Sequence, residues 1–285
     1  MKNKIVLVSG ANSGIGKSTA LALAKQGAQV ILQCRSEERG EAARKEIIAA
    51  SGNDNIDLML CDLASHDSIR QFAKEFRESY GHIDVLVNNA GGIFGKKIMS
   101  PDNREYTVGL NHMGYFLNTH YLMDLILAGE MKRVVNVSSL AHKFVLKIDW
   151  DNLEAEKTFG QFYQYGLSKL FNVYFTTELT KRYASEGLIS NCLHPGVVNT
   201  GFGESGSGFF KRLVELGRRF LTPADKGAET SIFLASAPEA SAFNGIYFAN
   251  KKPAKLSKLA QNQEIASKVW DKSLEWAGIA EFGKH

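Results

Sequence analysis

The chain has 285 residues, of which 44% are apolar, and its formal net charge is +4. This length and composition suffice for one large folded domain with a proper hydrophobic core. The mild charge, mixed in sign along the chain, gives no reason to expect a nucleic-acid partner. No apolar run approaches the roughly 20 residues that cross a bilayer, and the first strand starts too early to leave room for a signal peptide.

Three cysteines, Cys34, Cys61 and Cys192, each follow an apolar, strand-like run. An odd number of cysteines without a framework spacing indicates free, buried thiols in a reducing compartment. We therefore expect a cytoplasmic protein with no membrane span, for which weak contact with a membrane surface stays open.

The predicted elements begin with an apolar run at residues 5–8, which is followed by Gly10, Gly14 and Gly16 and by a helix-forming stretch at 17–26. A short, fully apolar run is typical of a strand that is buried on both faces. The glycines allow a sharp turn and a close approach to a ligand, and the start of the helix offers free N–H groups to an anion. This stretch therefore predicts a phosphate-binding strand–turn–helix.

Two interpretations of this stretch compete. The glycine spacing fits a dinucleotide-binding turn, whereas Gly16-Lys17-Ser18 also fits a loosened P-loop, in which the lysine reaches the terminal phosphates. The apolar run that ends in Asp62 is a second hint of a P-loop. Neither motif decides alone, so the choice depends on the rest of the chain.

Strands and helices alternate along the whole chain. Further strands are expected at residues 29–34, 56–61, 84–87, 133–138, 189–193 and 245–249. Further helices are expected at residues 37–50, 65–80, 101–128, 161–185, 222–236 and 264–277. The alternation predicts an α/β, doubly wound Rossmann fold: a mostly parallel, seven-stranded sheet with helices on both faces. Since no repeat or linker interrupts it, residues 1–285 read as one domain with a C-terminal helical tail at 253–285.

Polar residues gather where this topology places a ligand site, beyond the carboxyl ends of the parallel strands. Tyr165 and Lys169 lie four apart in the predicted helix 161–185 and so share one face. A free phenol titrates near ~10, and a neighbouring ammonium lowers that pKa. Such a pair also arises by chance, so it gains weight only from other motifs. The strand-end residues are Gly10, Cys34, Asp62, Asn88, Ser138 and His194.

Six motifs occur together in one order along the chain. They are Ser9-Gly10-x3-Gly14-Ile15-Gly16, Asn88-Asn89-Ala90-Gly91, Asn111, Ser138-Ser139, Tyr165-x3-Lys169 and Pro195-Gly196-x3-Thr200. With them, residues 4 to about 250 resemble the short-chain dehydrogenase/reductase family. A P-loop enzyme has no need of these later motifs, so the resemblance outweighs the P-loop interpretation. Ser9 replaces the usual threonine of the family but keeps the hydroxyl.

The resemblance implies a role for each matching residue. Tyr165 would give a proton to a carbonyl or take one from an alcohol, and Lys169 would lower the pKa of Tyr165 and bind the nicotinamide ribose. Ser139 would hold the substrate oxygen, and Asn111 would anchor a water that links Lys169 to solvent. His142 and Phe202 complete the expected substrate contacts. Besides Tyr165 and Lys169, the expected cofactor contacts are Gly10, Asn12, Ser13, Gly14, Ile15, Gly16, Asp62, Leu63, Asn89, Ala90, Gly91, Pro195, Gly196, Val198 and Thr200.

Two further features narrow the chemistry. Ser139 and Tyr165 are 26 residues apart, and with Ser139-Leu140-Ala141-His142 this insertion resembles the retinol-dehydrogenase-like branch, which acts on lipophilic aldehydes. The amino-terminal membrane segment of many such relatives is missing, so a retinoid substrate is not implied. Strand 29–34 ends in Arg35, with no acid before Glu37. A guanidinium there suits the extra phosphate of NADP, so we expect NADP(H) rather than NAD(H).

The sequence therefore predicts an NADP(H)-dependent oxidoreductase that interconverts a carbonyl compound, a lipophilic aldehyde or ketone, and its alcohol. Its partner is a small-molecule substrate, no metal is expected, and the chain is a monomer or a homodimer. An NADP-sensing regulator with the same fold and, third, a P-loop nucleotide hydrolase stay as alternatives. Phe171, Tyr174 and Phe175, on one of the long helices through which relatives dimerise, are expected to be a mixture of core and interface.

Residues 199–222 carry one more prediction. Apolar residues recur at three- and four-residue steps in 209–221, the pattern of an amphipathic helix, and four glycines precede them. We expect a lid helix that closes over an apolar substrate. A basic helix that lies on an anionic membrane is the competing interpretation.

Overall fold

The computed structural model describes residues 1–196 and 223–284. The predicted lid at 199–222, with its helix at 209–221, lies outside the described residues. So do three of the expected contact residues, Val198, Thr200 and Phe202.

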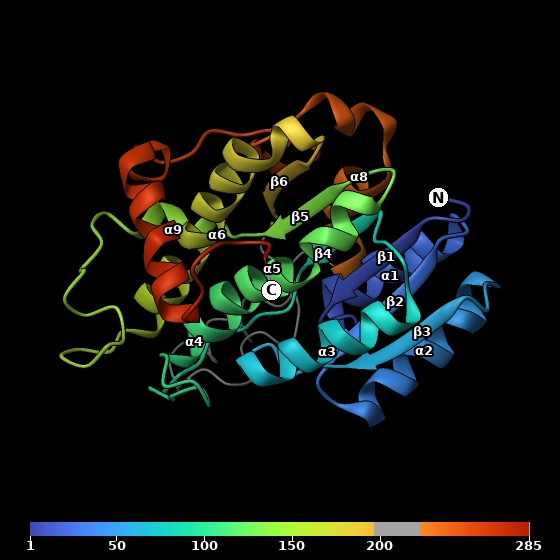
Figure 1. Ribbon diagram of the computed structural model, residues 1–285, viewed down its shortest axis with the longest axis horizontal. Helices are drawn as coiled ribbons and strands as arrows, with labels where there is room; N and C mark the ends of the chain where they lie inside the picture. Colours follow the sequence, from blue (N-terminus) through green and yellow to red (C-terminus); the bar gives the residue numbers. More distant parts are fainter. Residues whose placement is uncertain (197–222, 285) are drawn as a thin grey trace.

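Within the described ranges, eight strands form one sheet in the order β3-β2-β1-β4-β5-β6-β7-β8 (Figure 1). The seven strands β1 to β7 pair in parallel, which confirms the doubly wound prediction. The two-residue β8 adds an antiparallel edge that the prediction of seven strands missed. The strands are β1 Ile5–Ser9, β2 Gln29–Cys34, β3 Ile56–Leu60, β4 Val85–Asn88, β5 Arg133–Val137, β6 Ile189–His194, β7 Tyr247–Ala249 and β8 Lys252–Pro253.

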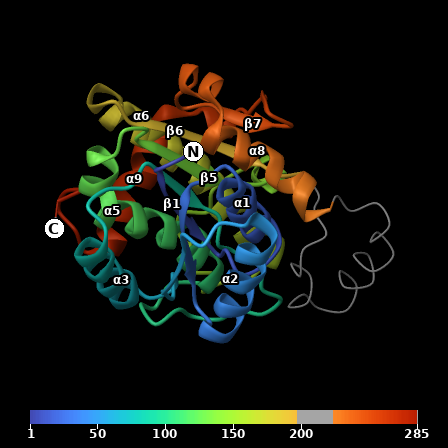
Figure 2. The same cartoon turned by 90° about the vertical axis from the view of Figure 1, so that its right-hand side faces the viewer.

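Helices cover both faces of the sheet, as predicted, with α3 and α5 on one side of β1 and α1 and α2 on the other (Figure 2). The alternation of strand side chains explains the two layers. Val6 and Val8 pack with α1 and α8, whereas Leu7 packs with α3, α5 and α6. The helices are α1 Gly14–Lys25, α2 Glu37–Ser51, α3 His66–Ser79, α4 Tyr106–Val108, α5 Gly114–Ala128, α6 Gln161–Tyr183, α8 Ala224–Ser236 and α9 Gln263–Ala277. Short helical turns lie at η1 Gly109–Met113, η2 Leu140–Phe144, η3 Ala184–Glu186, η6 Pro238–Ala242 and η7 Leu259–Gln261.

The prediction of one long helix from residue 101 to 128 is wrong. Ser100 caps a local turn instead, accepting hydrogen bonds from the N–H groups of Asp102 and Arg104. Asn103 has a φ of 57°, which is incompatible with a continuing right-handed helix. The helix starts at Tyr106, where the buried Glu105 carboxylate accepts from the Val108 N–H at 3.1 Å. Then η1, a π-helical turn, separates α4 from α5.

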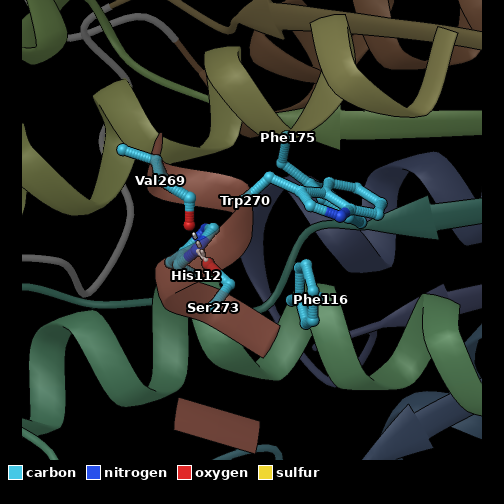
Figure 3. Close-up of a pocket in the computed structure, with 6 residues that line it drawn as sticks. All are labelled: His112, Phe116, Phe175, Val269, Trp270 and Ser273. Carbon is cyan, nitrogen blue, oxygen red and sulfur yellow. Dashed lines mark hydrogen bonds between the residues drawn. The ribbon is translucent and has the colours of Figure 1, made fainter. Parts of the chain in front are cut away.

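The C-terminal helix α9 packs on α5 and α6, which confirms the predicted helix at 264–277 (Figure 3). Trp270 of α9 packs its ring against Phe116 of α5 at 5.2 Å and against Phe175 of α6 at 6.1 Å. Phe171, Tyr174 and Phe175 are at most 2% exposed, so in the described structure they belong to the core rather than to an open interface. No helix in the described part of the chain is both long and apolar enough to cross a membrane.

Candidate active site

A cleft of about 180 Å³ opens at the carboxyl ends of β1, β4, β5 and β6. This is the switch point of the sheet, where the connections from the central strands leave in opposite directions. Glycines from the first turn and side chains from α6 therefore meet in one cavity. The lining residues are Gly10, Ser13, Gly14, Ile15, Gly16, Asn89, Ala90, Gly91, Val137, Ser138, Tyr165, Lys169 and Pro195.

Glycine is required at two positions of the first turn. Gly10 has a φ of 65°, and a Cβ there would lie 2.8 Å from the Cα of Ala90. A Cβ at Gly16 would lie 2.3 Å from the Gly10 carbonyl oxygen. Within the described structure, the first turn of α1 contains no acidic residue and its N-cap, Ser13, makes no side-chain capping bond. The free N–H groups of this helix start thus fit a pyrophosphate.

The Ser9 hydroxyl joins this turn to the one after β4. It accepts hydrogen bonds from the backbone N–H groups of Asn89 at 2.9 Å and Ala90 at 3.1 Å. The Asn89 amide returns a bond to the Ser9 carbonyl at 2.8 Å. Serine in place of the usual threonine therefore keeps the function of the hydroxyl, as expected.

Lys17 does not behave as a P-loop lysine. It pairs with Glu46 of α2 and is thus held on the outer side of α1. The second hint of a P-loop also has a local explanation, because the Asp62 carboxylate accepts from the Ala64 N–H at 3.0 Å. The neighbouring Leu63 is 5% exposed.

Arg35 follows β2, as predicted, and donates a hydrogen bond to the hydroxyl of Tyr106 at 2.8 Å. Arg35, Asp62 and Leu63 lie outside the set that lines the cleft. Tyr106 itself stands edge-on to Phe94, with ring centroids 4.8 Å apart. The guanidinium is therefore held by a rigid aromatic partner from the start of α4.

Tyr165 and Lys169 line one end of the cleft, which is called the catalytic end because their roles are predicted to lie there, and the Ser139 side chain forms a hydrogen bond with Tyr165. The Ser139 oxygen also accepts from the Ala141 N–H at 3.1 Å, which holds the hydroxyl between the η2 turn and Tyr165. Burial raises the pKa of Tyr165 to about 12, although the bond from Ser139 acts in the opposite direction. At neutral pH the side chain is therefore a phenol.

Lys169 lies one turn further along α6, with its nitrogen 5.8 Å from the centre of the Tyr165 ring. It donates to the Val137 carbonyl at 2.9 Å, and burial lowers its pKa to about 7. The expected lowering of the Tyr165 pKa by Lys169 is not found, because burial outweighs the effect of a partly charged amine at this distance.

Asn111 lies in the π-helical turn η1, a feature that often marks a functional site. Its amide bonds both backbone groups of Gly92, at 2.8 and 2.9 Å, and reaches Ser168 at 3.0 Å. A Cβ at Gly91 would lie 2.7 Å from the Asn111 side-chain oxygen and 3.4 Å from the Lys169 nitrogen. Asn111 thus fixes the turn beside Lys169, while its water-anchoring role stays a prediction.

Of the other predicted site residues, Pro195, Gly196 and His142, only Pro195 is among the residues that line the cleft. Pro195 lines the cleft, and Gly196, with a φ of 84°, donates its N–H to His194 at 3.0 Å. His142 has no exposed surface and is not among the lining residues of the cleft, so in the described structure it is a packing residue and not the substrate contact that we expected. Its ring bonds the Ser139 carbonyl at 2.6 Å instead.

Sequence reasoning gave no role to two residues that the structure brings to the site. Ser138 lines the cleft and donates its hydroxyl to the Lys169 carbonyl at 2.7 Å. Tyr106 holds Arg35 although the two are 71 positions apart. The serine pair was a usable signal for the first, whereas nothing in the local sequence indicated the second.

Comparison with known proteins agrees with this geometry. The family model described as short chain dehydrogenase matches residues 4–207. Retinol dehydrogenase 11 from Homo sapiens is 38% identical over 279 residues, which cover 98% of this chain and 87% of that protein. Retinol dehydrogenase 13 from Homo sapiens is 38% identical over 284 residues, covering 97% and 85%.

Solved structures show the same architecture. A crystal structure of an uncharacterised protein from Mycobacterium Paratuberculosis has a TM-score of 0.79 and 28% sequence identity, and the match covers 99% of this chain and 95% of that one. Motifs, sheet order and relatives all indicate the same group of oxidoreductases. The chain therefore belongs to the short-chain dehydrogenase family, in its retinol-dehydrogenase-like branch.

Proposed function

We propose that this protein interconverts a lipophilic aldehyde or ketone and its alcohol, that it uses NADP(H), and that Tyr165 is its acid and base. The observation that carries the proposal is that Tyr165 and Lys169 line the same cleft as the glycine turn, with the Ser139 side chain hydrogen-bonded to Tyr165. When bound, the nicotinamide ring of NADP(H) gives or takes the hydride.

The protonation states support this assignment. Because its pKa is raised to about 12, Tyr165 is a phenol at neutral pH and can give its proton to a carbonyl oxygen during reduction. The Ser139 hydroxyl, held beside Tyr165 by the Ala141 N–H, would turn its single proton to the same oxygen when a substrate is bound. Lys169, buried beside them, would stabilise the phenolate that remains whenever it carries its charge.

The preference for NADP(H) rests on Arg35. Its guanidinium is held by Tyr106 at the end of β2, where NAD-binding enzymes carry an acid for the ribose hydroxyls. A fixed, planar guanidinium suits a phosphate, since it can donate two parallel hydrogen bonds. No acid precedes Glu37 to repel that phosphate.

A lipophilic substrate is supported by exposed apolar side chains in the segments that neighbour Ser139 and Tyr165 in the sequence. Phe144 and Leu146, which follow Ser139 in the chain, are 78% and 87% exposed, and Phe162, before Tyr165, is 53% exposed. Exposed apolar groups grouped beside a site are typical of a surface that binds apolar ligands. Relatives named as retinol dehydrogenases point to the same class of substrate.

A substrate panel tests the proposal. The purified chain is mixed with NADPH or NADH and with all-trans-retinal, decanal, benzaldehyde or cyclohexanone, and the alcohol formed is measured by chromatography. We expect turnover of the long-chain aldehydes, with a higher kcat/KM for NADPH than for NADH. Tight binding of NADPH without turnover of any aldehyde, ketone or alcohol would instead support the NADP-sensing regulator.

A further inference from the structure

His142 is fully buried three residues after Ser139, and it contacts the same carbonyl twice. Its backbone N–H reaches the Ser139 oxygen at 3.2 Å and its ring nitrogen Nδ1 reaches that oxygen at 2.6 Å. A carbonyl oxygen can only accept, so Nδ1 must carry the proton. The ring is therefore fixed in one tautomer, with its other nitrogen, Nε2, unprotonated.

Within the described structure, the His142 ring has no hydrogen-bond partner besides the Ser139 carbonyl. Nε2 is buried and has no hydrogen-bond partner among the described residues. Tyr247 of β7 stands edge-on to the imidazole, with centroids 4.9 Å apart and planes at 77°. Burial lowers the pKa of His142 to about 4, and the neighbouring Lys143 and His194 act in the same direction. At neutral pH the ring is thus uncharged, and among the described residues its only hydrogen bond is to Ser139.

The η2 turn consequently holds both oxygens of Ser139. Ala141 donates to the hydroxyl oxygen at 3.1 Å, while the two donors of His142 hold the carbonyl. A rotation of the Ser139 backbone would break all three bonds. Since the Ser139 side chain also hydrogen-bonds Tyr165, the orientation of the Ser139–Tyr165 pair depends on this turn.

We propose that His142 is a positioning residue for the reaction: its Nδ1–H fixes the Ser139 carbonyl and thereby aims the Ser139 hydroxyl at Tyr165 and the substrate oxygen. His142 touches neither cofactor nor substrate in this role and acts through Ser139 alone. The effect on turnover rests on the proposed function, whereas the tautomer of His142 can be tested without any substrate.

Three variants separate positioning from simple packing. His142→Leu keeps the bulk but removes the donor, so kcat should fall roughly tenfold to a hundredfold, the scale of a misplacement of about 1 Å, while the KM for NADPH changes little. His142→Asn places an amide N–H where Nδ1–H was, so most of the lost kcat should return. His120→Leu is the control, because His120 is also buried and bonds the backbone of Gly283 far from the cleft.

A double-mutant cycle tests whether the effect passes through Ser139. In a Ser139→Ala background, His142→Leu should cause no further loss of kcat, because the hydroxyl that it aims is already gone. Independent, multiplicative losses from the two substitutions would contradict the proposal. So would an equal loss of kcat in His142→Asn and His142→Leu when both variants keep the wild-type fold by circular dichroism.

Nitrogen-15 NMR of labelled histidine gives a readout that does not depend on activity. The His142 signal, assigned by its absence in His142→Leu, should show a protonated Nδ1 and an unprotonated Nε2 at neutral pH. A protonated Nε2 would overturn the proposal, even if the enzyme reduced every aldehyde tested. If the predicted tautomer were found in a protein without turnover, the contact between His142 and Ser139 would stand. The result would then count against the proposed function instead.

Discussion

The two ends of the cleft are built by different physical means. The nucleotide end depends on the absence of side chains, because a Cβ at Gly10 or Gly16 would collide with neighbouring backbone. The catalytic end depends on burial, which raises the pKa of Tyr165 to about 12 and lowers that of Lys169 to about 7. If the proposed function holds, steric fit controls cofactor binding and protonation controls turnover, so mutations at the two ends should be separable.

The largest effect should come from the catalytic end. Tyr165→Phe removes only the transferable proton, so kcat should fall by about 10² or more while the Kd for NADPH changes little. Steady-state kinetics and fluorescence titration measure the two quantities. Tyr163→Phe, on the same helix, is the matched control and should keep its kcat. Near-normal turnover in Tyr165→Phe would remove Tyr165 from the mechanism.

The opposite pattern should follow a change at the nucleotide end. The Cβ of Gly16→Ala would lie 2.3 Å from the Gly10 oxygen, so the turn that is expected to face the pyrophosphate must shift. NADPH binding should weaken accordingly, by roughly tenfold to a hundredfold. Gly81→Ala is the control, since a Cβ there meets nothing within 4 Å. Unchanged NADPH affinity in Gly16→Ala would show that the glycine turn with Gly10 and Gly16 does not hold the cofactor.

Within the nucleotide end, Arg35 allows a separate test of the preference for NADPH over NADH. Arg35→Ala should weaken NADPH binding by about 1.5–3 kcal/mol, as expected for a charge-assisted contact, and leave NADH binding nearly unchanged. Parallel titrations with the two nucleotides measure the difference. Equal losses for both would mean that Arg35 does not read the phosphate.

A smaller effect, on folding stability rather than on turnover, is expected from His112 of η1. The His112 ring forms a hydrogen bond with Ser273 of α9 at 2.8 Å (Figure 3). Burial lowers the pKa of His112 to about 3, so the unfolded chain binds this proton more readily than the folded one. The resulting stability is present above pH ~6.5 and is lost as the pH falls toward 3, with about 2 kcal/mol gone by pH ~5.

Urea unfolding at pH 7.5 and 5 measures this loss. The free energy of unfolding of His112→Asn should fall less between the two values than that of the wild type, because one buried histidine no longer titrates. An identical fall in both proteins would contradict the assignment of the effect to His112.

Regular patterns made most of the fold predictable. The alternation of buried strands and amphipathic helices predicted a doubly wound, mostly parallel sheet, because parallel pairing leaves few topologies open. The failure between residues 101 and 128 has a physical reason. Ser100-Pro101 is a sound local start signal, but a buried Glu105 carboxylate and the left-handed Asn103 move the start to Tyr106. Such tertiary burial is not visible in a local pattern.

The candidate site was predictable where it depends on residue identity and unpredictable where it depends on packing. The motif glycines, Tyr165 and Lys169 line one cleft, and Ser139 hydrogen-bonds Tyr165. The pKa of Tyr165 was predicted in the wrong direction, because a helix spacing shows the neighbouring lysine but not the depth of burial. His142 was placed at the substrate for the same reason.

The most direct test of the role of Tyr165 compares the pH dependence of the two reaction directions. Reduction needs the phenol and oxidation needs the phenolate, so the raised pKa makes opposite demands on the two directions. We predict that kcat for alcohol oxidation rises by up to about tenfold per pH unit above neutral pH, while kcat for aldehyde reduction does not rise. The same pH dependence in both directions, or oxidation that is fastest at acidic pH, would contradict the account.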